Sequence, residues 1–283
     1  MKRAADTGEN GGGVRPPRDR TDMTRRTGES WRPPIFSPPG KRPLVSALRR
    51  FLDLQAGSIW RDLAGQLPLI HGNVLDVGCG AQPYRELLGP DASYRGIDIA
   101  AAKANFGYEV PDTTYYEGDT WPVADQSIDF VLCTETMEHV PDPRKLLAEA
   151  ARCLKPGGWI MLTTPFSARW HYIPHDYWRY TPSSLTLLLR EAGFNVPEVY
   201  ARGNAVTVAC YKSMALVLPF LMPQGRGAPV TLALRLISIL LIPFLAFFAV
   251  IGNLSLMGRG GDDCLGYTAM AIRSASAGSE RAA

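Results

Sequence analysis

The chain has 283 residues, and 46% of them are apolar, which is enough to bury the core of one domain of ordinary size with additions. The formal net charge of +3 is too small to indicate a nucleic-acid-binding protein, so we expect no nucleic-acid partner. The five cysteines are widely spaced and include no CxxC pair, which argues against a disulfide framework or a structural zinc site and fits a reducing compartment.

The N-terminal stretch differs in composition from the rest of the chain. Residues 1–43 are rich in Arg, Gly and Pro and contain few large apolar groups, so we expect a disordered tail without a secretory signal peptide. A second disordered tail is expected over residues 275–283. Between Leu44 and Leu67 the apolar residues recur at near-helical spacing, with a break expected around Gly57.

From residue 73 onward, short apolar runs alternate with helical segments. The expected strands are Asn73–Val77, Ser93–Ile99, Thr113–Glu117, Ser127–Cys133, Trp159–Thr163, Phe194–Tyr200 and Cys264–Ile272. The expected helices are Pro83–Leu88, Pro143–Leu154 and Thr181–Ala192, the last with Thr181 as N-cap, Pro182 in its first turn and Gly193 as C-cap. This alternation predicts an α/β domain with a mainly parallel sheet covered on both faces.

Acidic residues and glycines stand where the first three strands end. The first strand runs through Asp76 into Gly78-Cys79-Gly80, where glycines let the backbone approach a ligand closely. Asp98 ends the second strand, the place where an acidic side chain accepts hydrogen bonds from ribose hydroxyls in nucleotide-binding folds. The third strand is followed by Glu117-Gly118-Asp119-Thr120, in which the Asp119 side chain can accept a hydrogen bond from an adenine amino group. Each signal is also typical of an ordinary turn, a helix cap or a solvated loop.

Together these residues resemble a known family. Asp76–Gly80, Asp98, Gly118-Asp119, Asp129-Phe130-Val131, Glu138-His139-Val140 and Leu154–Gly158 are similar in order and spacing to the class I S-adenosylmethionine-dependent methyltransferases, in the subgroup that also contains ubiquinone and menaquinone methyltransferases. The resemblance covers residues 73–200, with Cys264–Ile272 as the last strand. It implies a Rossmann-like seven-stranded sheet of order 3-2-1-4-5-7-6 with strand 7 antiparallel, and S-adenosylmethionine as cofactor.

The resemblance also implies which residues bind the cofactor. The glycine loop would surround it, Asp98 would hold the ribose, Asp119 the adenine amino group, and Glu135 would lie near the methionine end. The full expected set is Asp76, Gly78, Cys79, Gly80, Asp98, Ile99, Asp119, Thr120 and Glu135.

One departure from the family concerns the loop. The family commonly has a third glycine two residues after Gly80, where this chain has Gln82. A tighter loop or a changed contact to the methionine moiety would follow, or Gln82 marks a subgroup. Residues 78–84 and 175–182 are similar to methyltransferases found among surface-polysaccharide and glycolipid biosynthesis proteins.

The loop after the fifth strand contains candidates for a general base. The sulfonium already activates its methyl group, so the protein mainly aligns donor and acceptor, and we expect no metal. The catalytic candidates are His175, Asp176 and Tyr177, with His171 nearby. We favour His175, because Asp176 and Arg179 beside it could set its tautomer. The alternative is that this loop only packs as a lid over the cofactor.

An apolar insertion separates the last two strands. Leu236–Met257 carries no charge and as one helix would reach about 30 Å, the thickness of a hydrocarbon core. Val206–Pro223 precedes it with only Lys212 charged, and Pro219, Pro223 and Pro243 would kink or end these helices. Since the chain must return to complete the sheet, we expect a monotopic attachment at the cytoplasmic face of the membrane, in contact with lipid. The alternative is a cytoplasmic protein whose apolar helices form a homodimer interface.

The sequence therefore predicts four regions. Residues 44–204 and 262–274 form the methyltransferase domain, residues 205–261 the membrane-associated hairpin, and residues 1–43 and 275–283 the tails. The expected acceptor is lipid-linked or amphiphilic, either a glycolipid or polysaccharide precursor or a prenylated ring. Three alternatives remain open: a soluble small-molecule methyltransferase, a non-catalytic nucleotide-binding or scaffold protein, and a nicotinamide-dependent oxidoreductase.

Overall fold

A computed structural model of the whole chain describes residues 23–29, 43–102, 109–223 and 227–275. The expectation of disordered tails falls mostly on residues outside these ranges. Residues 23–29 are an exception, because Met23–Arg25 forms a 3₁₀ turn and the Glu29 side chain accepts hydrogen bonds from Tyr172 N at 2.7 Å and Arg169 Nη2 at 3.0 Å. This part of the expected tail is tied to the loop that follows the fifth strand.

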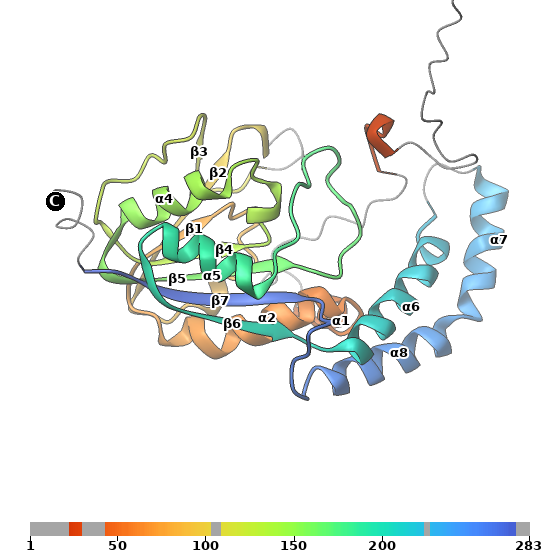
Figure 1. Cartoon of the computed structure of the whole chain (residues 1–283). Helices are drawn as coiled ribbons and strands as arrows, with labels where there is room; N and C mark the ends of the chain where they lie inside the picture. The colour runs from red at the N-terminus through yellow and green to blue at the C-terminus, as the bar shows by residue number, and fades with distance from the viewer. Residues whose placement is uncertain (1–22, 30–42, 103–108, 224–226, 276–283) are drawn as a thin grey trace, which may run out of the picture.

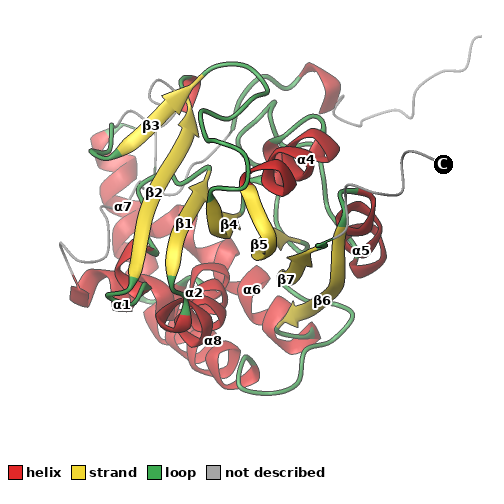
Figure 2. Ribbon diagram, turned by 90° about the vertical axis from the view of Figure 1, so that its left-hand side faces the viewer, coloured by secondary structure: helices red, strands yellow, loops and turns green. Residues whose placement is uncertain are grey.

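The seven expected strands form one sheet in the expected order, β3-β2-β1-β4-β5-β7-β6 (Figure 2). Their bounds are β1 Gly72–Val77, β2 Ala92–Ile99, β3 Thr113–Tyr116, β4 Ile128–Thr134, β5 Leu154–Pro165, β6 Phe194–Arg202 and β7 Gly266–Arg273. Neighbouring strands from β3 to β5 are parallel, whereas β7 is antiparallel to both β5 and β6. The Rossmann-like methyltransferase architecture is confirmed.

Helices cover both faces of the sheet (Figure 1). On one face, α2 (Leu54–Gln66) buries Ile59 and Leu63 against apolar residues of β1, β4 and β5, and Leu67 just after the helix joins them. On the other face, α4 (Pro143–Cys153) and α5 (Pro182–Glu191) pack against a larger cluster from the same strands and β7. Because both faces are covered, the ligand-accessible parts of the sheet are its edges and strand ends.

Two local expectations are corrected. The N-terminal helical segment breaks at Asp53, which caps α2 after α1 (Pro43–Leu52), and not at Gly57. Gly57 instead lies inside α2 where the helices touch, since a Cβ there would come 2.4 Å from the Arg50 carbonyl oxygen. The expected helix Pro83–Leu88 is only a 3₁₀ turn, Arg85–Leu87, and Gln82 before it takes the left-handed conformation (φ +53°).

The apolar insertion forms three helices, α6 (Ala205–Leu221), α7 (Ala228–Ile239) and α8 (Ile242–Ser255). The uncharged run Leu236–Met257 is therefore not one helix: it breaks at residues 240–241, and Pro243 stands in the first turn of α8. Among the described helices none alone is long and apolar enough to cross a membrane, although Pro229–Ile237 and Ile242–Ser255 together meet that test by length and composition, bent by 56°.

The insertion leaves the sheet after β6 and rejoins it at β7, at the same end of the sheet. Arg202 at the end of β6 and Pro165 at the end of β5 both pair with Gly266, the first residue of β7. This is the end of the sheet where the parallel strands finish, and Figure 1 shows α6, α7 and α8 beyond it. Helices α6 and α8 bury Met214, Val217 and Ala249 against each other and against Leu54 of α2.

Candidate functional site

The loop after β1 has the backbone of a ligand-binding turn. Gly78 (φ +67°) and Gly80 (φ +51°) both take left-handed conformations that favour glycine. A Cβ on Gly78 would lie 2.5 Å from the Thr136 side chain, so no larger residue fits beside the segment that follows β4. Gly78 N and Cys79 N donate to the Ile97 carbonyl, which fastens the loop to β2.

Gln82 occupies the place of the family's third glycine. Its left-handed backbone (φ +53°) is the conformation that a glycine would take without strain. The buried side chain donates from Nε2 to Thr113 Oγ1 at 2.9 Å and to the Pro111 carbonyl at 3.3 Å. Its Oε1 accepts from Arg85 at 3.0 Å. The amide thus joins the β1 loop to the start of β3, and these bonds hold the strained turn.

Asp98 lies at the end of β2, almost fully buried. Its Oδ2 accepts from Gly80 N at 3.1 Å and its Oδ1 from Ile99 N at 2.8 Å. Burial raises the pKa of this carboxyl, although both backbone N–H groups oppose that rise. Each oxygen keeps a further lone pair, so the carboxylate is able to accept from a pair of ribose hydroxyls.

Asp76 is buried one strand away. Its Oδ2 accepts from the Tyr94 hydroxyl at 2.8 Å, while Oδ1 has no hydrogen-bond partner among the described residues. Burial raises the pKa of Asp76 from 3.8 to about 7, with the nearby Asp98 adding to the rise and the Tyr94 hydrogen bond opposing it. An orphaned buried oxygen at this end of the sheet is consistent with a polar ligand that is not part of the protein.

The adenine-binding candidates are placed differently. Asp119 and Thr120 are exposed in the loop after β3, and Asp119 Oδ2 accepts from Lys145 Nζ at 2.6 Å. This ion pair raises the pKa of Lys145. The ends of β1, β2 and β3 are adjacent, so Asp76, Asp98 and Asp119 follow three neighbouring strands. The donors and acceptors at this edge fit an adenosyl cofactor.

Glu135 follows β4 in a left-handed conformation (φ +48°). Its Oε1 accepts from Arg202 Nη2 at 2.7 Å, and Arg202 also donates to the Thr164 carbonyl at 3.0 Å and to Ser58 Oγ at 3.2 Å. Arg202 is buried at the end of β6. Its bonds to Glu135 and to the Thr164 carbonyl of β5 therefore connect the expected methionine end of the site to the ends of β5 and β6.

The loop over residues 166–181 is docked onto the segment after β4. Tyr177 N donates to the Glu138 carbonyl at 2.8 Å, Trp178 Nε1 to the Val140 carbonyl at 3.0 Å, and the Tyr180 hydroxyl to the Met137 carbonyl at 3.0 Å. These backbone-directed bonds place the catalytic candidates beside the end of β4.

Asp176 is paired with different partners from those expected. It accepts two hydrogen bonds from Arg179, at 2.6 and 2.8 Å, and one from His171 N at 3.0 Å. Although burial alone would raise it, these bonds hold the pKa of Asp176 well below its usual range. Its oxygen also lies 3.2 Å from His171 Nδ1, so Asp176 orients His171 and not His175. His175 Nδ1 instead lies 3.2 Å from the Tyr177 hydroxyl.

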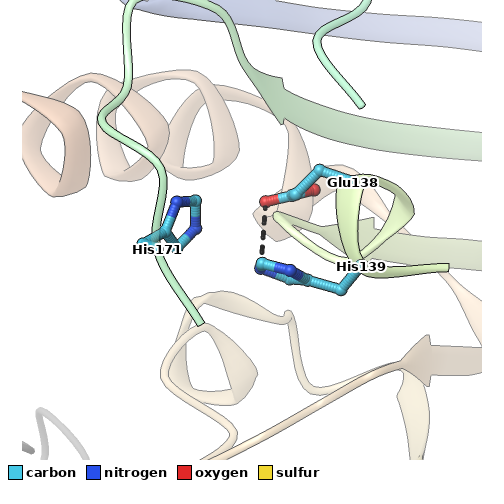
Figure 3. Close-up of side chains that lie close together, drawn as sticks. All are labelled: Glu138, His139 and His171. Atoms are coloured by element: carbon cyan, nitrogen blue, oxygen red, sulfur yellow. Dashed lines mark ion pairs between the residues drawn. The ribbon is translucent and has the colours of Figure 1, made fainter. Parts of the chain in front are cut away.

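The fold brings Glu138, His139 and His171 together at this position (Figure 3). One ligand atom from each lies within 4.8 Å of the other two. Burial raises the pKa of Glu138 well above its usual value, with Glu135 adding to the rise, and burial lowers the pKa of His139 to about 4. Burial opposes the charged form of His171, but the hydrogen bond to Asp176 raises its pKa.

Sequence reasoning did not single out this cluster or Arg202. His171 stands 32 positions after His139, outside any metal-ligand spacing along the chain, and Arg202 at a strand end reads as a surface residue. The adjacent pair Glu138-His139 can be read from the sequence. The third residue of the cluster, His171, reaches the pair because the 166–181 loop docks beside it.

Comparison with known proteins identifies related chains. A family model described as a methyltransferase domain matches residues 42–199. The ubiquinone biosynthesis O-methyltransferase of Thiobacillus denitrificans is 32% identical over 158 residues, 47% of this chain and 68% of that protein. That of Paracidovorax citrulli is 36% identical over 115 residues, 37% of this chain and 48% of that protein. The chain thus matches between about half and two thirds of these relatives' length.

Solved structures with a similar fold have low sequence identity. An S-adenosylmethionine-dependent methyltransferase of Thermotoga maritima is 16% identical, with a TM-score of 0.48 and coverage of 83% of this chain and 98% of that one. Phosphoethanolamine N-methyltransferase 2 of Haemonchus contortus, solved with S-adenosylhomocysteine, is 16% identical, with a TM-score of 0.45 and coverage of 76% and 53%.

Proposed function

This chain belongs to the class I S-adenosylmethionine-dependent methyltransferases, and on that premise we propose that it methylates an oxygen of an amphiphilic acceptor at a membrane surface. The family match decides against a nicotinamide-dependent oxidoreductase. The relatives named as ubiquinone biosynthesis O-methyltransferases favour a hydroxylated ring with a prenyl tail over a glycolipid or polysaccharide precursor as the acceptor.

The cofactor supplies a methyl group already activated by its sulfonium. On our proposal Asp98 and Ile99 hold its ribose, the Asp76–Gly80 loop surrounds it, Asp119 and Thr120 receive the adenine, and Glu135 faces the methionine end. Asp98 supports this assignment most directly, because its buried oxygens stand at the strand end with lone pairs to spare. To bind the adenine amino group, the Asp119 carboxylate would have to break its ion pair with Lys145 or accept hydrogen bonds from both groups.

The remaining task of the protein is to orient the acceptor hydroxyl and receive its proton. His175 and Tyr177 are the candidates, since His175 Nδ1 lies 3.2 Å from the Tyr177 hydroxyl on the loop beside β4. Asp176 would act through His171, because its oxygens are already taken by Arg179 and His171.

One observation carries the choice of an amphiphilic acceptor: the apolar helices leave and rejoin the sheet at the carboxyl ends of its parallel strands, the same end at which the expected cofactor residues lie. An acceptor whose polar head reaches this edge can keep its apolar tail among the same helices. The acceptor therefore does not have to leave the lipid phase to react.

Exposed apolar side chains of the insertion support a lipid partner. They are Val206, Leu216, Phe220, Met222, Val230, Leu232, Leu236, Ile237, Ile239, Leu240, Ile242, Phe244, Phe247, Val250, Leu254 and Met257. Helix α8 carries no charged residue, and α7 carries only Arg235. An exposed apolar surface of this extent is typical of an interaction site, and we propose the cytoplasmic face of a bilayer as its partner.

Transfer of a radioactive methyl group in the presence of lipid vesicles tests the proposal. Two acceptors are compared, a catechol with a polyprenyl tail and the same catechol without it. We expect kcat/KM at least about 10-fold higher for the tailed catechol, because burial of each methylene favours binding. Equal rates for both would overturn the amphiphilic acceptor and favour a soluble methyltransferase. Cofactor binding without transfer to any acceptor would favour a non-catalytic protein.

A further inference from the structure

The Glu29 side chain joins the N-terminal stretch to the loop that follows β5. Its Oε1 accepts from Tyr172 N at 2.7 Å and its Oε2 from Arg169 Nη2 at 3.0 Å, across 143 and 140 positions of the sequence. Only 6% of this side chain is exposed, although it belongs to a stretch rich in arginine, glycine and proline. A carboxylate is buried to this extent when it is paired, and its bonds to a backbone N–H and a guanidinium are stronger than neutral hydrogen bonds. The contact is therefore a specific attachment of the N-terminal stretch to the loop.

The residues before Glu29 form a local turn that presents it. Met23–Arg25 is a 3₁₀ turn (Figure 1, red), Arg26 N donates to the Met23 carbonyl at 3.2 Å, and Arg26 Nε donates to the Gly28 carbonyl at 3.1 Å. We call residues 23–29 the N-terminal strap, and Glu29 is its one acidic residue. The internal hydrogen bonds of the strap limit where the Glu29 carboxylate can lie.

Tyr172 connects Glu29 to His175, the favoured candidate for the general base. Tyr172 donates its N–H to Glu29, while its carbonyl accepts from His175 N at 2.8 Å. The centroid of its ring lies 5.5 Å from that of His175 and 5.1 Å from that of His139. Tyr172 takes a left-handed conformation (φ +51°), which an aromatic residue adopts at a cost, so its neighbours have to hold it there. Release of Glu29 therefore removes a contact that fixes the residue packed against His175.

Arg169, the second partner of Glu29, holds the other end of this turn. Its carbonyl oxygen accepts from Arg179 Nη2 at 3.0 Å, so the turn is also tied to a later part of the loop. Residues 177–180 are in turn bound to the segment after β4. The loop is thus fastened at its base by the segment after β4 and at its tip, residues 169–172, by Glu29.

We propose that Glu29 is a positioning residue for methyl transfer, which holds the tip of the loop so that His175 lies beside the end of β4. The proposal rests on the proposed function, in which His175 and Tyr177 receive the proton of the acceptor hydroxyl. A small displacement of a group that takes part in a reaction lowers the rate, since the reacting atoms must stay aligned. Because Glu29 acts through Tyr172, its loss is expected to slow the transfer step and to leave cofactor binding unchanged.

Hydrogen exchange of the full chain, followed by mass spectrometry, tests the contact without any substrate. We expect the backbone amides of residues 169–175 to exchange at least about 10-fold faster in Glu29→Ala than in the wild type, because Tyr172 N loses its acceptor and the tip its ion pair. Glu29→Gln is expected to lie between the two, since the amide oxygen can still accept from Tyr172 N. Glu191→Ala is the matched control, because Glu191 makes an ion pair of the same length, 3.0 Å, with Arg144 between α5 and α4. Helix α2 should exchange alike in all four proteins, which would show that the fold is intact.

Methyl transfer to the tailed catechol tests the role of Glu29 in the reaction. We expect kcat at least about 10-fold lower in Glu29→Ala, with the Kd for S-adenosylmethionine changed by less than about twofold, and wild-type values in Glu191→Ala. Unchanged exchange of residues 169–175 in folded Glu29→Ala would overturn the proposal, as would faster exchange with an unchanged or higher kcat. Equal wild-type rates on the tailed and untailed catechols would overturn the amphiphilic acceptor alone, since Glu29→Ala is then expected to be slower on both.

Discussion

Arg202, the last residue of β6, donates a hydrogen bond of 2.7 Å to the carboxylate of Glu135, which follows β4. The two residues are 67 positions apart and are separated in the sheet by β5 and β7. Arg202 also begins the connection into the apolar helices, so this ion pair links the expected cofactor site to the point where the insertion leaves the sheet. The further hydrogen bonds to Thr164 and Ser58 make Arg202 a buried anchor.

Removal of this anchor is expected to destabilise the fold. We predict that Arg202→Met lowers the free energy of unfolding by about 2–4 kcal/mol, because Glu135 and the Thr164 carbonyl lose a buried donor. Arg144→Gln is the control, since its ion pair with Glu191 is exposed and should contribute less than about 1 kcal/mol. Urea unfolding followed by circular dichroism measures both, and equal losses would contradict the buried role of Arg202.

Asp98→Asn should weaken cofactor binding without unfolding the protein. The amide retains the size of the side chain but loses the charge and one acceptor, so we expect a 10- to 100-fold higher Kd for S-adenosylmethionine, equivalent to about 1.5–3 kcal/mol. Isothermal titration calorimetry measures the change. Asp91→Asn, in the exposed loop before β2, is the control and should bind like the wild type. An unaltered Kd in Asp98→Asn would remove the ribose assignment.

The stability of the cofactor-free protein should depend on the titration of Asp76. Burial raises its pKa from 3.8 to about 7, so the native state binds more protons than the unfolded state between these values. The free energy of unfolding therefore falls as the pH rises from about 4 to about 7. We predict that this pH-dependent fall in the free energy of unfolding, on the order of 1–4 kcal/mol, is absent from Asp76→Asn. Urea unfolding of both proteins at a series of pH values measures it. Parallel pH profiles for the two proteins would show that Asp76 titrates normally.

Charges placed on the insertion should abolish vesicle binding. Leu240 and Phe247 are exposed by 79% and 59%, so Leu240→Glu with Phe247→Glu should leave the fold intact while opposing contact with a bilayer. We expect the double variant to remain in the supernatant when the wild type sediments with anionic vesicles. Leu187→Glu on α5, exposed by 54%, is the matched control and should sediment like the wild type. Dimer dissociation in place of lost vesicle binding would support the dimer-interface alternative.

The strands were predictable because short apolar runs alternate with helical segments along the chain, and the first three runs end at a glycine or an acidic residue. Asp76 and Asp98 lie at strand ends as expected, since alternation of strands and helices places such residues at one edge. The order of the sheet came from the family resemblance, as spacing alone does not determine it. Gly57 shows the limit of local patterns, because its small size serves contact with Arg50 and not a helix break.

The candidate site was harder to predict where it depends on contacts between distant segments. Asp176 stands next to His175 in the sequence, but the loop turns it toward His171 and Arg179. The uncharged run Leu236–Met257 is long enough for one helix, but it breaks at residues 240–241, and Pro243 stands in the first turn of the next helix, in line with the expectation that it would kink or end a helix. The orientation of Asp176 does not follow from its adjacency to His175, because it depends on how the loop packs.

A crystal structure of the protein with S-adenosylhomocysteine tests the central claim most directly. The account predicts the adenosyl group at the ends of β1, β2 and β3, with both ribose hydroxyls donating to the Asp98 carboxylate and the adenine amino group donating to Asp119. An adenosyl group bound elsewhere, with the Asp98 carboxylate in contact only with Gly80 and Ile99, would contradict it.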